Sequence, residues 1–490
     1  MGAGQSSAPA DRRPVPAGWR LRRADGLAIL DGGRTFVGGF PLRILTLSRG
    51  GAALATAWLA GQPVGGDPAE RELARRLLDA GLADPDPPIG ARSTAEVTII
   101  VPVYADATRL AVGAARLAAC LAPVAKDATV IVVDDGSPDG GPIAAVAGEY
   151  GARYVRLAEN RGPSAARNAG LQLAATPLVA FLDADCLPPA RFPDKLVDHL
   201  ADPAVALVAP RIVPVPGGRG PIAAYERSHS ALDMGRQASP VRPYSPVWYV
   251  PSAAMVARRD ALGAGFDEDL SLGEDVDLVW RLHDAGWQLR YDPGITVAHE
   301  DRVRPDAWYR RRVAYNESVA QLLSRHPERV PVMFLTPRAA LAWAAALAGW
   351  PGPLLLLAGD RARRFRRHFR GRLPGATAWA ARTSVQMTLH EGRDLARAVA
   401  GPWAPFAVSL LLALPRGRRR RALAGRIGGL LAAMAVGDWL ADRPDLDPLR
   451  FAVLRLADES TRGLGIWIGC ARKRDFRGLL PRRPPPTGRR

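Results

Sequence analysis

Two pairs of carboxylates in this sequence could hold a metal ion and move a proton. Asp183 and Asp185 are separated by one alanine and follow the apolar run 178–182, which predicts a buried strand. Like charges this close are costly unless a cation neutralises them, and Mg²⁺ is commonly held by one or two carboxylates plus substrate phosphates. Glu274 and Asp275 open a predicted helix, whose dipole favours ionised carboxylates. We therefore expect a divalent cation, Mg²⁺ or Mn²⁺, at the first pair and a general base, Asp275, at the second.

Each of these signals has a simpler structural alternative. The Asp183 pair could lie in an exposed loop without binding anything, and Glu274 could only cap its helix. His299 ends a predicted strand, where it could contact a metal ion or a diphosphate or have a structural role alone. Trp248 and Tyr249 offer aromatic faces that suit stacking on a sugar, but both could equally belong to the core. The fold around these residues decides between the readings.

The elements that must position these side chains alternate between strands and helices. Apolar strands are predicted at 97–103, 129–133, 154–157 and 178–182, and helices at 108–121, 143–150 and 164–175. Such alternation is typical of βαβ units, which build a mostly parallel sheet with helices on both faces. Ligands bind at the carboxyl ends of the strands in these sheets, so the residues that follow each strand are the candidates for binding. The first strand is not followed by Gly-x-Gly-x-x-Gly, so the usual dinucleotide-binding fold is not expected.

Polar residues follow all four strands and open the later helix. They are Val-Pro-Val-Tyr at 101–104, Asp-Asp-Gly-Ser at 134–137, Glu-Asn-Arg-Gly-Pro-Ser-Ala-Ala-Arg-Asn at 159–168, Asp-Ala-Asp at 183–185 and Gly-Glu-Asp at 273–275. In this order and at these separations they resemble the family 2 glycosyltransferases of the GT-A fold, over about residues 95–325. The resemblance implies an α/β GT-A nucleotide-sugar-binding fold and an inverting, metal-dependent transfer of a sugar from a nucleotide donor.

The same resemblance implies roles for individual residues. Contacts to the donor nucleotide are implied for Pro102, Tyr104, Asp134, Asp135, Asn160, Arg161, Arg167, Asn168 and Asp183. A metal ion, Mg²⁺ or Mn²⁺, is implied at Asp185 and Asp183, and we add His299 to its predicted ligands. Asp275, beside Glu274, is implied as the catalytic base that deprotonates the acceptor hydroxyl. We expect the acceptor to lie against Trp248 and Tyr249.

Four further stretches narrow the resemblance to the mycofactocin-system glycosyltransferase family. They are Leu-Asp-Gly-Gly-Arg at 30–34 with Gly-Gly-Phe-Pro-Leu-Arg at 38–43, Ser-Ala-Leu-Asp-Met-Gly at 230–235, Tyr-Val-Pro-Ser-Ala-Ala at 249–254 and Gly-Glu-Asp-Val-Asp-Leu-Val-Trp-Arg-Leu at 273–282. That family implies transfer of a hexose, glucose from UDP-glucose, onto a peptide-derived redox cofactor (mycofactocin) or its precursor, which builds a β-linked oligosaccharide. The residues themselves leave open a cell-envelope polysaccharide or lipid acceptor, and a catalytically inactive GT-A-like peptide scaffold.

The chain divides into five predicted parts. Residues 1–18 are expected to be disordered, 19–86 to form a winged-helix-like module, 95–325 a GT-A catalytic domain, 331–470 a helical region and 471–490 a basic tail. Within the module we expect strands at 27–30 and 35–37 and helices at 41–54 and 70–82, followed by a linker at 84–90. The module resembles the small winged-helix domains that recognise precursor peptides, which implies peptide binding. The alternative is an appendage that only packs on the next domain.

The net charge of +18 on this 490-residue chain comes entirely from its last third. Residues 331–490 contain 29 basic and 10 acidic side chains, with uncharged stretches at 339–359, 398–415 and 427–437 and arginine runs at 361–370 and 416–421. Re-entrant or interfacial helices at the cytoplasmic face of the cell membrane would satisfy both features, and a soluble helical domain with a basic face is the alternative. The arginine runs mostly lack interleaved aromatic residues, so we expect no nucleic acid partner.

Overall fold

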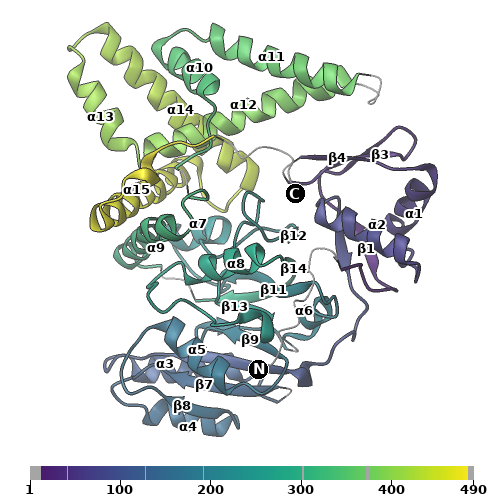
Figure 1. The fold of residues 1–490 in the computed structure, drawn as a ribbon. Helices are drawn as coiled ribbons and strands as arrows, with labels where there is room; N and C mark the ends of the chain where they lie inside the picture. Colours follow the sequence, from purple (N-terminus) through teal and green to yellow (C-terminus); the bar gives the residue numbers. More distant parts are fainter. Residues whose placement is uncertain are drawn as a thin grey trace. The chain divides into compact units, whose positions relative to one another are not determined.

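The computed structural model describes residues 13–40, 42–126, 128–190, 192–300, 303–330, 332–370 and 376–483. The chain forms two compact units (Figure 1). Residues up to 217 together with 230–301 make the first unit, and residues 218–229 together with those from 302 onward make the second.

The two expected terminal segments are only partly described. Residues 1–12 and 484–490 lie outside the described residues. Val15, expected in a disordered segment, is fully buried in the core of the module predicted at 19–86, which we call the front module. Part of the expected tail belongs to a helical core cluster, because Leu479 packs with Cys470 and Ile466. Both corrections have the same cause: an apolar side chain beyond the predicted boundary finds a core to pack in.

A nine-stranded sheet runs through the first unit in the order β10-β14-β11-β13-β9-β6-β7-β8, with β12 paired to β14. The strands are β6 (Val97–Val103), β7 (Thr129–Asp134), β8 (Arg153–Arg156), β9 (Leu178–Leu182), β10 (Cys186–Leu187), β11 (Val205–Pro214), β12 (Ser239–Pro240), β13 (Ala254–Arg258) and β14 (Gln288–His299). The parallel pairing predicted for the first four strands is confirmed in β9, β6, β7 and β8. Next to β9 the sheet changes direction, since β13 pairs with both β9 and β11 in antiparallel fashion.

Helices cover both faces of this sheet, as the sequence predicts. One face is covered by α3 (Leu110–Leu121), α4 (Gly141–Glu149) and α6 (Asp194–His199), and the other by α5 (Pro163–Leu173), beside α8 (Glu274–Asp284). On the first face, Leu117 and Ile143 pack with Val101 in one buried core cluster. On the other face, Gly170 of α5 lies so close to the sheet that an added Cβ would be 2.4 Å from Cγ2 of Ile100.

The pairing of β6 explains how a proline fits inside a central strand. The ladder between β6 and β9 ends at Ile100, opposite Phe181, whereas the ladder between β6 and β7 continues to Val103, opposite Asp134. Pro102 therefore lies beyond the β9 ladder, where its missing N–H costs no ladder hydrogen bond. Pro102, which is predicted to contact the nucleotide, therefore lies in the part of β6 that pairs with β7 and no longer with β9.

The front module contains five short strands and two helices. They are β1 (Arg20–Arg23), β2 (Ala28–Leu30), β3 (Thr35–Gly38), β4 (Arg43–Thr46), α1 (Arg49–Leu59), α2 (Pro68–Asp79) and β5 (Ala83–Asp86). The helix predicted over 41–54 is wrong in its first half, because residues 43–46 pair with β3 and the helix begins only after Ser48, whose side chain caps it. The linker predicted at 84–90 is also shorter, because β5 pairs back with β1.

A buried ion pair joins this module to the sheet. Arg75 of α2 donates to both carboxylate oxygens of Asp202, at 2.7 and 2.6 Å, and both side chains are 1% exposed. Asp202 lies in the turn before β11 and also accepts from the N–H of Ala204 at 3.0 Å. Breaking such a buried pair leaves an uncompensated charge. Loss of either side chain would therefore destabilise the packing of the module on the rest of the first unit.

The second unit is built of helices. They are α7 (Pro221–His229), α9 (Pro305–Arg325), α10 (Pro337–Ala348), α11 (Gly352–Phe369), α12 (Ala376–Ala400), α13 (Ala404–Ala413), α14 (Arg418–Asp442) and α15 (Pro448–Lys473). Tyr225 of α7 packs against Trp308 of α9 and Phe451 of α15, with ring centroids 6.1 and 5.7 Å away. This core assigns α7 and α9 to the helical unit, although the sequence placed both within the catalytic domain.

Two parts of the helical unit meet the length and composition of a membrane span among the described residues. One is α14, and the other is the pair α12 and α13, which is bent by 78°. The uncharged stretch predicted at 339–359 is divided between α10 and α11, because Pro351 and the residues before it interrupt the helix.

Candidate active site

One buried arginine joins the two carboxylate pairs that the sequence singled out. Arg167, on α5, donates from Nη2 to Asp183 at 2.7 Å and from Nη1 to Glu274 at 3.0 Å. Its guanidinium lies 5.3 Å from the ring centroid of Phe266, and the residue is 2% exposed. Burial alone would lower the pKa of Arg167, but Asp183 and Glu274 raise it above its ordinary value. The arginine therefore stays charged and fixes the carboxyl end of β9 against the start of α8.

The start of α8 is set by a glycine. Gly273 has a φ of 85°, a left-handed conformation that glycine adopts without strain, and the helix begins directly after it. Glu274 and Asp275 consequently lie in the first helical turn, where backbone N–H groups have no partner within the helix. The sequence-based prediction of a helix with carboxylates at its start is confirmed.

Asp275, the predicted base, is held by backbone N–H groups. The N–H of Val276 donates to Oδ1 at 2.8 Å and the N–H of Ser252 donates to Oδ2 at 3.3 Å. Burial and, second to it, the charge of Glu274 raise the pKa of Asp275 to about 7. The helix dipole alone would keep Asp275 ionised, as the sequence predicts, but the loss of water around the carboxyl outweighs it. A carboxyl with a pKa near 7 is suited to accept a proton and release it again at neutral pH.

Glu274 is buried beside the base and faces protein groups. Its Oε1 accepts from Arg167 at 3.0 Å and from the Ser252 hydroxyl at 3.3 Å. Ser252 therefore contacts both carboxylates, through its hydroxyl and its N–H. The sequence alone predicts no role for this serine, because a single serine in a loop carries no spacing pattern. Glu274 and Ser252 position Asp275, and neither needs to touch a substrate to do so.

The predicted metal ligands lie close together, but they do not form a three-ligand cluster. Oδ1 of Asp185 is 3.4 Å from Nε2 of His299, because β10 and β14 place Cys186 opposite His299. Asp183 is bound by Arg167. In the part of the chain that the structure describes, no group of three or more His, Cys, Asp and Glu side chains could hold a metal ion. Asp185, with a side chain 39% exposed, still fits a cation that takes its other ligands from a diphosphate.

The two adjacent aspartates after β7 have different surroundings. Asp135 accepts from the N–H groups of Arg161 at 2.9 Å and Gly162 at 2.8 Å, so it ties the loop after β8 to the end of β7. Burial raises its pKa. Asp134 is fully buried, and its two oxygens accept from the Ser137 N–H at 2.9 Å and from a tyrosine hydroxyl at 2.8 Å. Both aspartates are buried, and their contacts with protein groups hold the loops that follow β7 and β8.

The remaining predicted nucleotide residues divide into exposed and buried ones. Tyr104 and Asn160 are exposed in the loops after β6 and β8. Arg161 is half exposed and donates to Glu268 at 2.7 Å. Asn168 is buried, and its Nδ2 also donates to Glu268, at 2.9 Å. Glu268 thus connects two predicted residues, and no motif in the sequence pointed to it.

The aromatic pair predicted for the acceptor is backed by α8. The ring centroids of Trp248 and Tyr249 are 4.4 Å apart, and that of Trp280, on α8, is 5.9 Å from Trp248. The Trp280 indole N–H also donates to the backbone oxygen of Trp248 at 3.0 Å. Trp248 is 42% exposed, whereas Tyr249 is half-buried. Of the two readings that the sequence left open, stacking remains available to Trp248.

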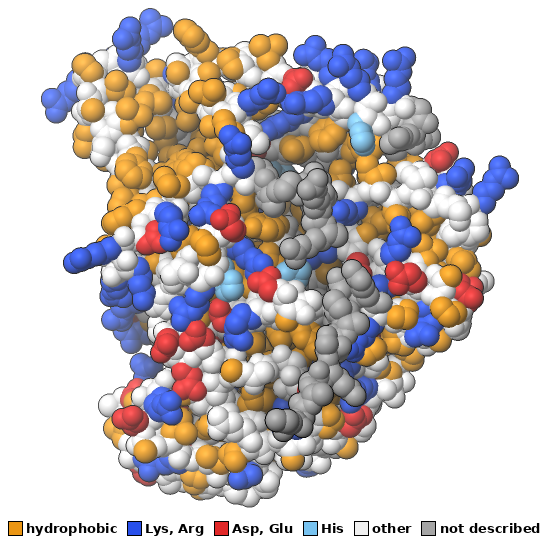
Figure 2. All heavy atoms as spheres, viewed as in Figure 1, with side chains coloured by type: hydrophobic (Ala, Val, Ile, Leu, Met, Phe, Trp, Pro, Cys, Tyr) orange, Lys and Arg blue, Asp and Glu red, His pale blue; other side chains and the backbone are white. Residues whose placement is uncertain are grey.

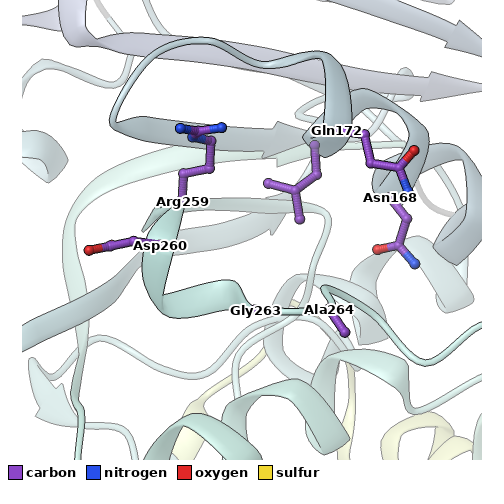
Figure 3. A pocket seen from close by; sticks show the side chains of 7 residues that line it. Asn168, Gln172, Arg259, Asp260, Gly263 and Ala264 are labelled. Atoms are coloured by element: carbon purple, nitrogen blue, oxygen red, sulfur yellow. The ribbon is translucent and has the colours of Figure 1, made fainter. Parts of the chain in front are cut away.

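A pocket of about 420 Å³ lies elsewhere on the first unit, between α5 and the short helix η3 (Asp260–Leu262). Arg259 and Asp260 lie on one side of it and Asn168 and Gln172 on the other (Figure 3). None of the carboxylates described above lines it. We therefore place the candidate active site at Asp183, Asp185 and Asp275 and not in this pocket.

Comparison with known proteins points to one enzyme class. The sequence model of glycosyl transferase family 2 matches residues 98–266. A Mycobacterium tuberculosis protein described as pre-mycofactocin glycosyltransferase is 37% identical over 487 residues, 95% of this chain and 98% of the relative. Glycosyltransferase AglE of Haloferax volcanii is 28% identical over 214 residues, 42% of this chain and 67% of that protein. A solved mannosyltransferase of Pyrobaculum calidifontis, in complex with GDP-Man and Mn²⁺, is 20% identical and aligns with 62% of this chain and 90% of its own, with a TM-score of 0.37.

The raised pKa of Asp275 predicts that this side chain costs stability at neutral and higher pH. Between the ordinary value of 3.8 and about 7, the unfolded chain loses the proton while the folded chain keeps it, so the folding free energy becomes less favourable as pH rises. Asp275→Asn removes that cost. We expect the melting temperature of the variant to exceed that of the wild type at about pH 8, by roughly 1–2 °C per kcal/mol, and the difference to shrink toward pH 4.

Asp284→Asn is the matched control, because Asp284 is an exposed carboxylate at the end of the same helix. Both variants are compared with the wild type by thermal unfolding in the presence of a chelator. A gain for Asp275→Asn that is equal at both pH values would contradict the pKa assignment.

Proposed function

Because this chain belongs to the pre-mycofactocin glycosyltransferases of family 2, we propose that it transfers a hexose, glucose from UDP-glucose, onto a peptide-derived mycofactocin precursor with inversion at the anomeric carbon. The first unit has the α/β GT-A architecture, with its sheet and covering helices. The observation that supports the proposal most strongly is the Arg167 bridge, which holds the base side of the site at Glu274 beside the donor side at Asp183. A single displacement requires both sides within reach of one sugar.

The proposed chemistry is one in-line displacement. Asp275 takes the proton of an acceptor hydroxyl, and the oxygen forms a bond to the anomeric carbon while the bond from that carbon to the diphosphate oxygen breaks. Attack from the face opposite the leaving diphosphate turns an α-linked donor into a β-linked product. Trp248 supplies an aromatic face on which a sugar can stack.

A divalent cation, Mg²⁺ or Mn²⁺, is the proposed cofactor. Asp185 would hold it, with His299 3.4 Å away, and the donor diphosphate would supply further oxygen ligands. When bound, such an ion neutralises charge that develops on a leaving diphosphate. Asp183 stays bound to Arg167 in this arrangement and keeps the loop in place.

Asp275→Asn tests the proposed base. We expect transfer to fall by roughly 10²–10⁴-fold, because the amide cannot accept the proton, while UDP-glucose binding is retained. The peptide-derived acceptor is incubated with UDP-glucose and Mg²⁺ or Mn²⁺, and its mass is followed over time. The wild type should add successive hexose units.

Asp284→Asn should add hexose units at the wild-type rate, since Asp284 is exposed at the far end of α8. Near-normal transfer by Asp275→Asn would remove Asp275 from the base role. A wild-type protein that binds UDP-glucose but modifies neither a peptide-derived acceptor nor a lipid acceptor would favour the inactive-scaffold reading.

Asp185→Ala tests the metal assignment. We expect the variant to lose the part of its UDP affinity that depends on Mn²⁺, because Asp185 is the exposed carboxylate at that position. Binding of UDP is measured by calorimetry with Mn²⁺ and with a chelator, for both proteins. If adding Mn²⁺ strengthens binding equally in the two proteins, Asp185 does not hold the ion.

We also propose that the front module binds the peptide part of the acceptor. Strand β4 is an edge of its three-stranded sheet in the described residues, since only β3 pairs with it. Three apolar side chains at every second position are exposed at the start of this edge: Phe40 and Leu42 in the turn residues before β4, and Ile44 within the strand. An edge strand with alternating apolar side chains is a surface onto which an extended peptide can add as a further strand.

Ile44→Asp is expected to raise the KM for the peptide acceptor by about tenfold or more with little change in kcat, because a buried Ile contact contributes roughly 1.5–3 kcal/mol. Ile89→Asp places the same charge at a more exposed isoleucine outside the strands and should leave KM unchanged. Equal KM values for wild type and Ile44→Asp would place peptide recognition elsewhere.

A further inference from the structure

The helical unit exposes a large share of the chain's apolar side chains. Of 27 large apolar side chains exposed among the described residues, 13 lie on α10–α14 and the turn between α10 and α11. We call these the apolar surface: Leu341, Trp350, Leu355, Leu356, Val385, Met387, Leu389, Phe406, Val408, Leu410, Leu412, Val436 and Leu440. Helix α13 contributes most densely, and none of its residues is buried. In Figure 2 hydrophobic side chains gather over this part of the unit, with Lys and Arg at its margin.

The helices that carry the apolar surface pack on one another along their inner sides. Ala339 of α10 and Leu395 of α12 share one core cluster with Leu430 of α14. Arg426 of α14 donates to the backbone oxygen of Leu347, at the end of α10, at 3.1 Å. Helix α13 contacts α12 and α14, so the turn with Trp350 and the helices α13 and α14 belong to one packed group, and the apolar surface is its outer side.

The charge beside this surface is mostly positive, although Asp360 and Asp442 are partly exposed at its edges. Residues 395–437 contain no Asp or Glu and seven arginines, four of them consecutive at 418–421. A second run, 361–370, contains six arginines. Of these, Arg361 is paired with Glu391, and several others are exposed. Exposed apolar side chains flanked by exposed arginines match the acyl chains and the phosphates of an anionic lipid layer.

The same geometry argues for one leaflet and against a span. At 1.5 Å per residue the ten residues of α13 cover about 15 Å, half of the ~30 Å hydrocarbon core. Four arginines open α14 after a connection of four residues, and an arginine at the centre of a bilayer is unfavourable. The other end of α14 is fixed in the protein, because Asp438 is buried and ion-paired with Arg455 at 2.8 Å.

We propose that the apolar surface is a membrane-binding surface, on which α13 and the α10–α11 turn enter one leaflet of an anionic bilayer while the arginines at 361–370 and 416–421 bind lipid phosphates. This inference does not depend on which sugar or acceptor the enzyme uses. It makes the protein monotopic, with the whole chain on one side of the membrane.

A fluorescent label at Leu410 tests the insertion. All three native cysteines, Cys120, Cys186 and Cys470, are buried, so a cysteine introduced at an exposed position can be labelled selectively. Full-length Leu410→Cys carrying an environment-sensitive dye should brighten and shift to the blue with phosphatidylglycerol vesicles. The same dye on Val112→Cys, an exposed site on α3, should not respond. Lipids that carry a quencher high in the acyl chain should quench the Leu410 label more than lipids that carry it near the bilayer centre.

Replacement of Arg418–Arg421 by glutamine tests the charge. Binding to phosphatidylglycerol vesicles, measured by flotation, should weaken by about 100-fold or more, because each basic residue near an anionic surface contributes about a fivefold factor. Arg20, Arg22, Arg34 and Arg49 are exposed in the front module, and changing them to glutamine alters the net charge equally but should leave flotation unchanged. Melting temperatures of both variants confirm that they are folded.

Three results would overturn the proposal. One is a Leu410 label that does not respond to the vesicles. Another is a label that responds equally to raised protein concentration without lipid, which would make the surface a contact between copies of the chain. The third is strongest quenching from the bilayer centre, which would indicate a span.

Discussion

The buried guanidinium of Arg167 is the interaction on which the catalytic site depends. It carries the only positive charge in direct contact with both Asp183 and Glu274 among the described residues, and these two carboxylates come from elements far apart in the chain. A buried ion group of this kind adds little net stability, because desolvation offsets the attraction, yet loss of one member leaves an uncompensated charge. We infer that the role of the bridge is to position the site, because it holds the end of β9 and the start of α8 at a fixed distance from each other.

Two other features share the property of being unfavourable for the isolated fold. Asp275 keeps a carboxyl where burial and Glu274 oppose its charge. Helix α13 keeps apolar side chains in water with no protein cover. Neither arrangement improves folding, and the two proposals give each a reason: Asp275 would accept a proton from the acceptor, and α13 would enter a lipid layer. Features that reduce the stability of a fold in this way are concentrated at functional sites.

The sequence predicted the parallel half of the sheet well, because β6, β7 and β9 are continuous apolar runs bounded by polar tips. It also located the carboxylates, since their place after a strand or at a helix start is visible in one dimension. It misassigned β4 as helix, because Ile44 and Leu45 fit either period and only pairing with β3 decides. The roles of Ser252 and Glu268 could not be predicted from the sequence, because their partners, Asp275 and Asn168, are distant in the chain. The three predicted metal ligands do not form one cluster in the described residues, for a related reason: the Asp183 carboxylate is ion-paired with Arg167.

The ion pair between Arg75 and Asp202 sets a limit on how this chain can be divided. A shortened protein that begins after β5 would retain the Asp202 carboxylate in the turn before β11 without the cation that neutralises it. The front module alone would lack the Asp202 carboxylate that pairs with Arg75, a side chain that is 1% exposed in the whole protein. A different front module could therefore replace this one only if its second helix carried an arginine at the same place.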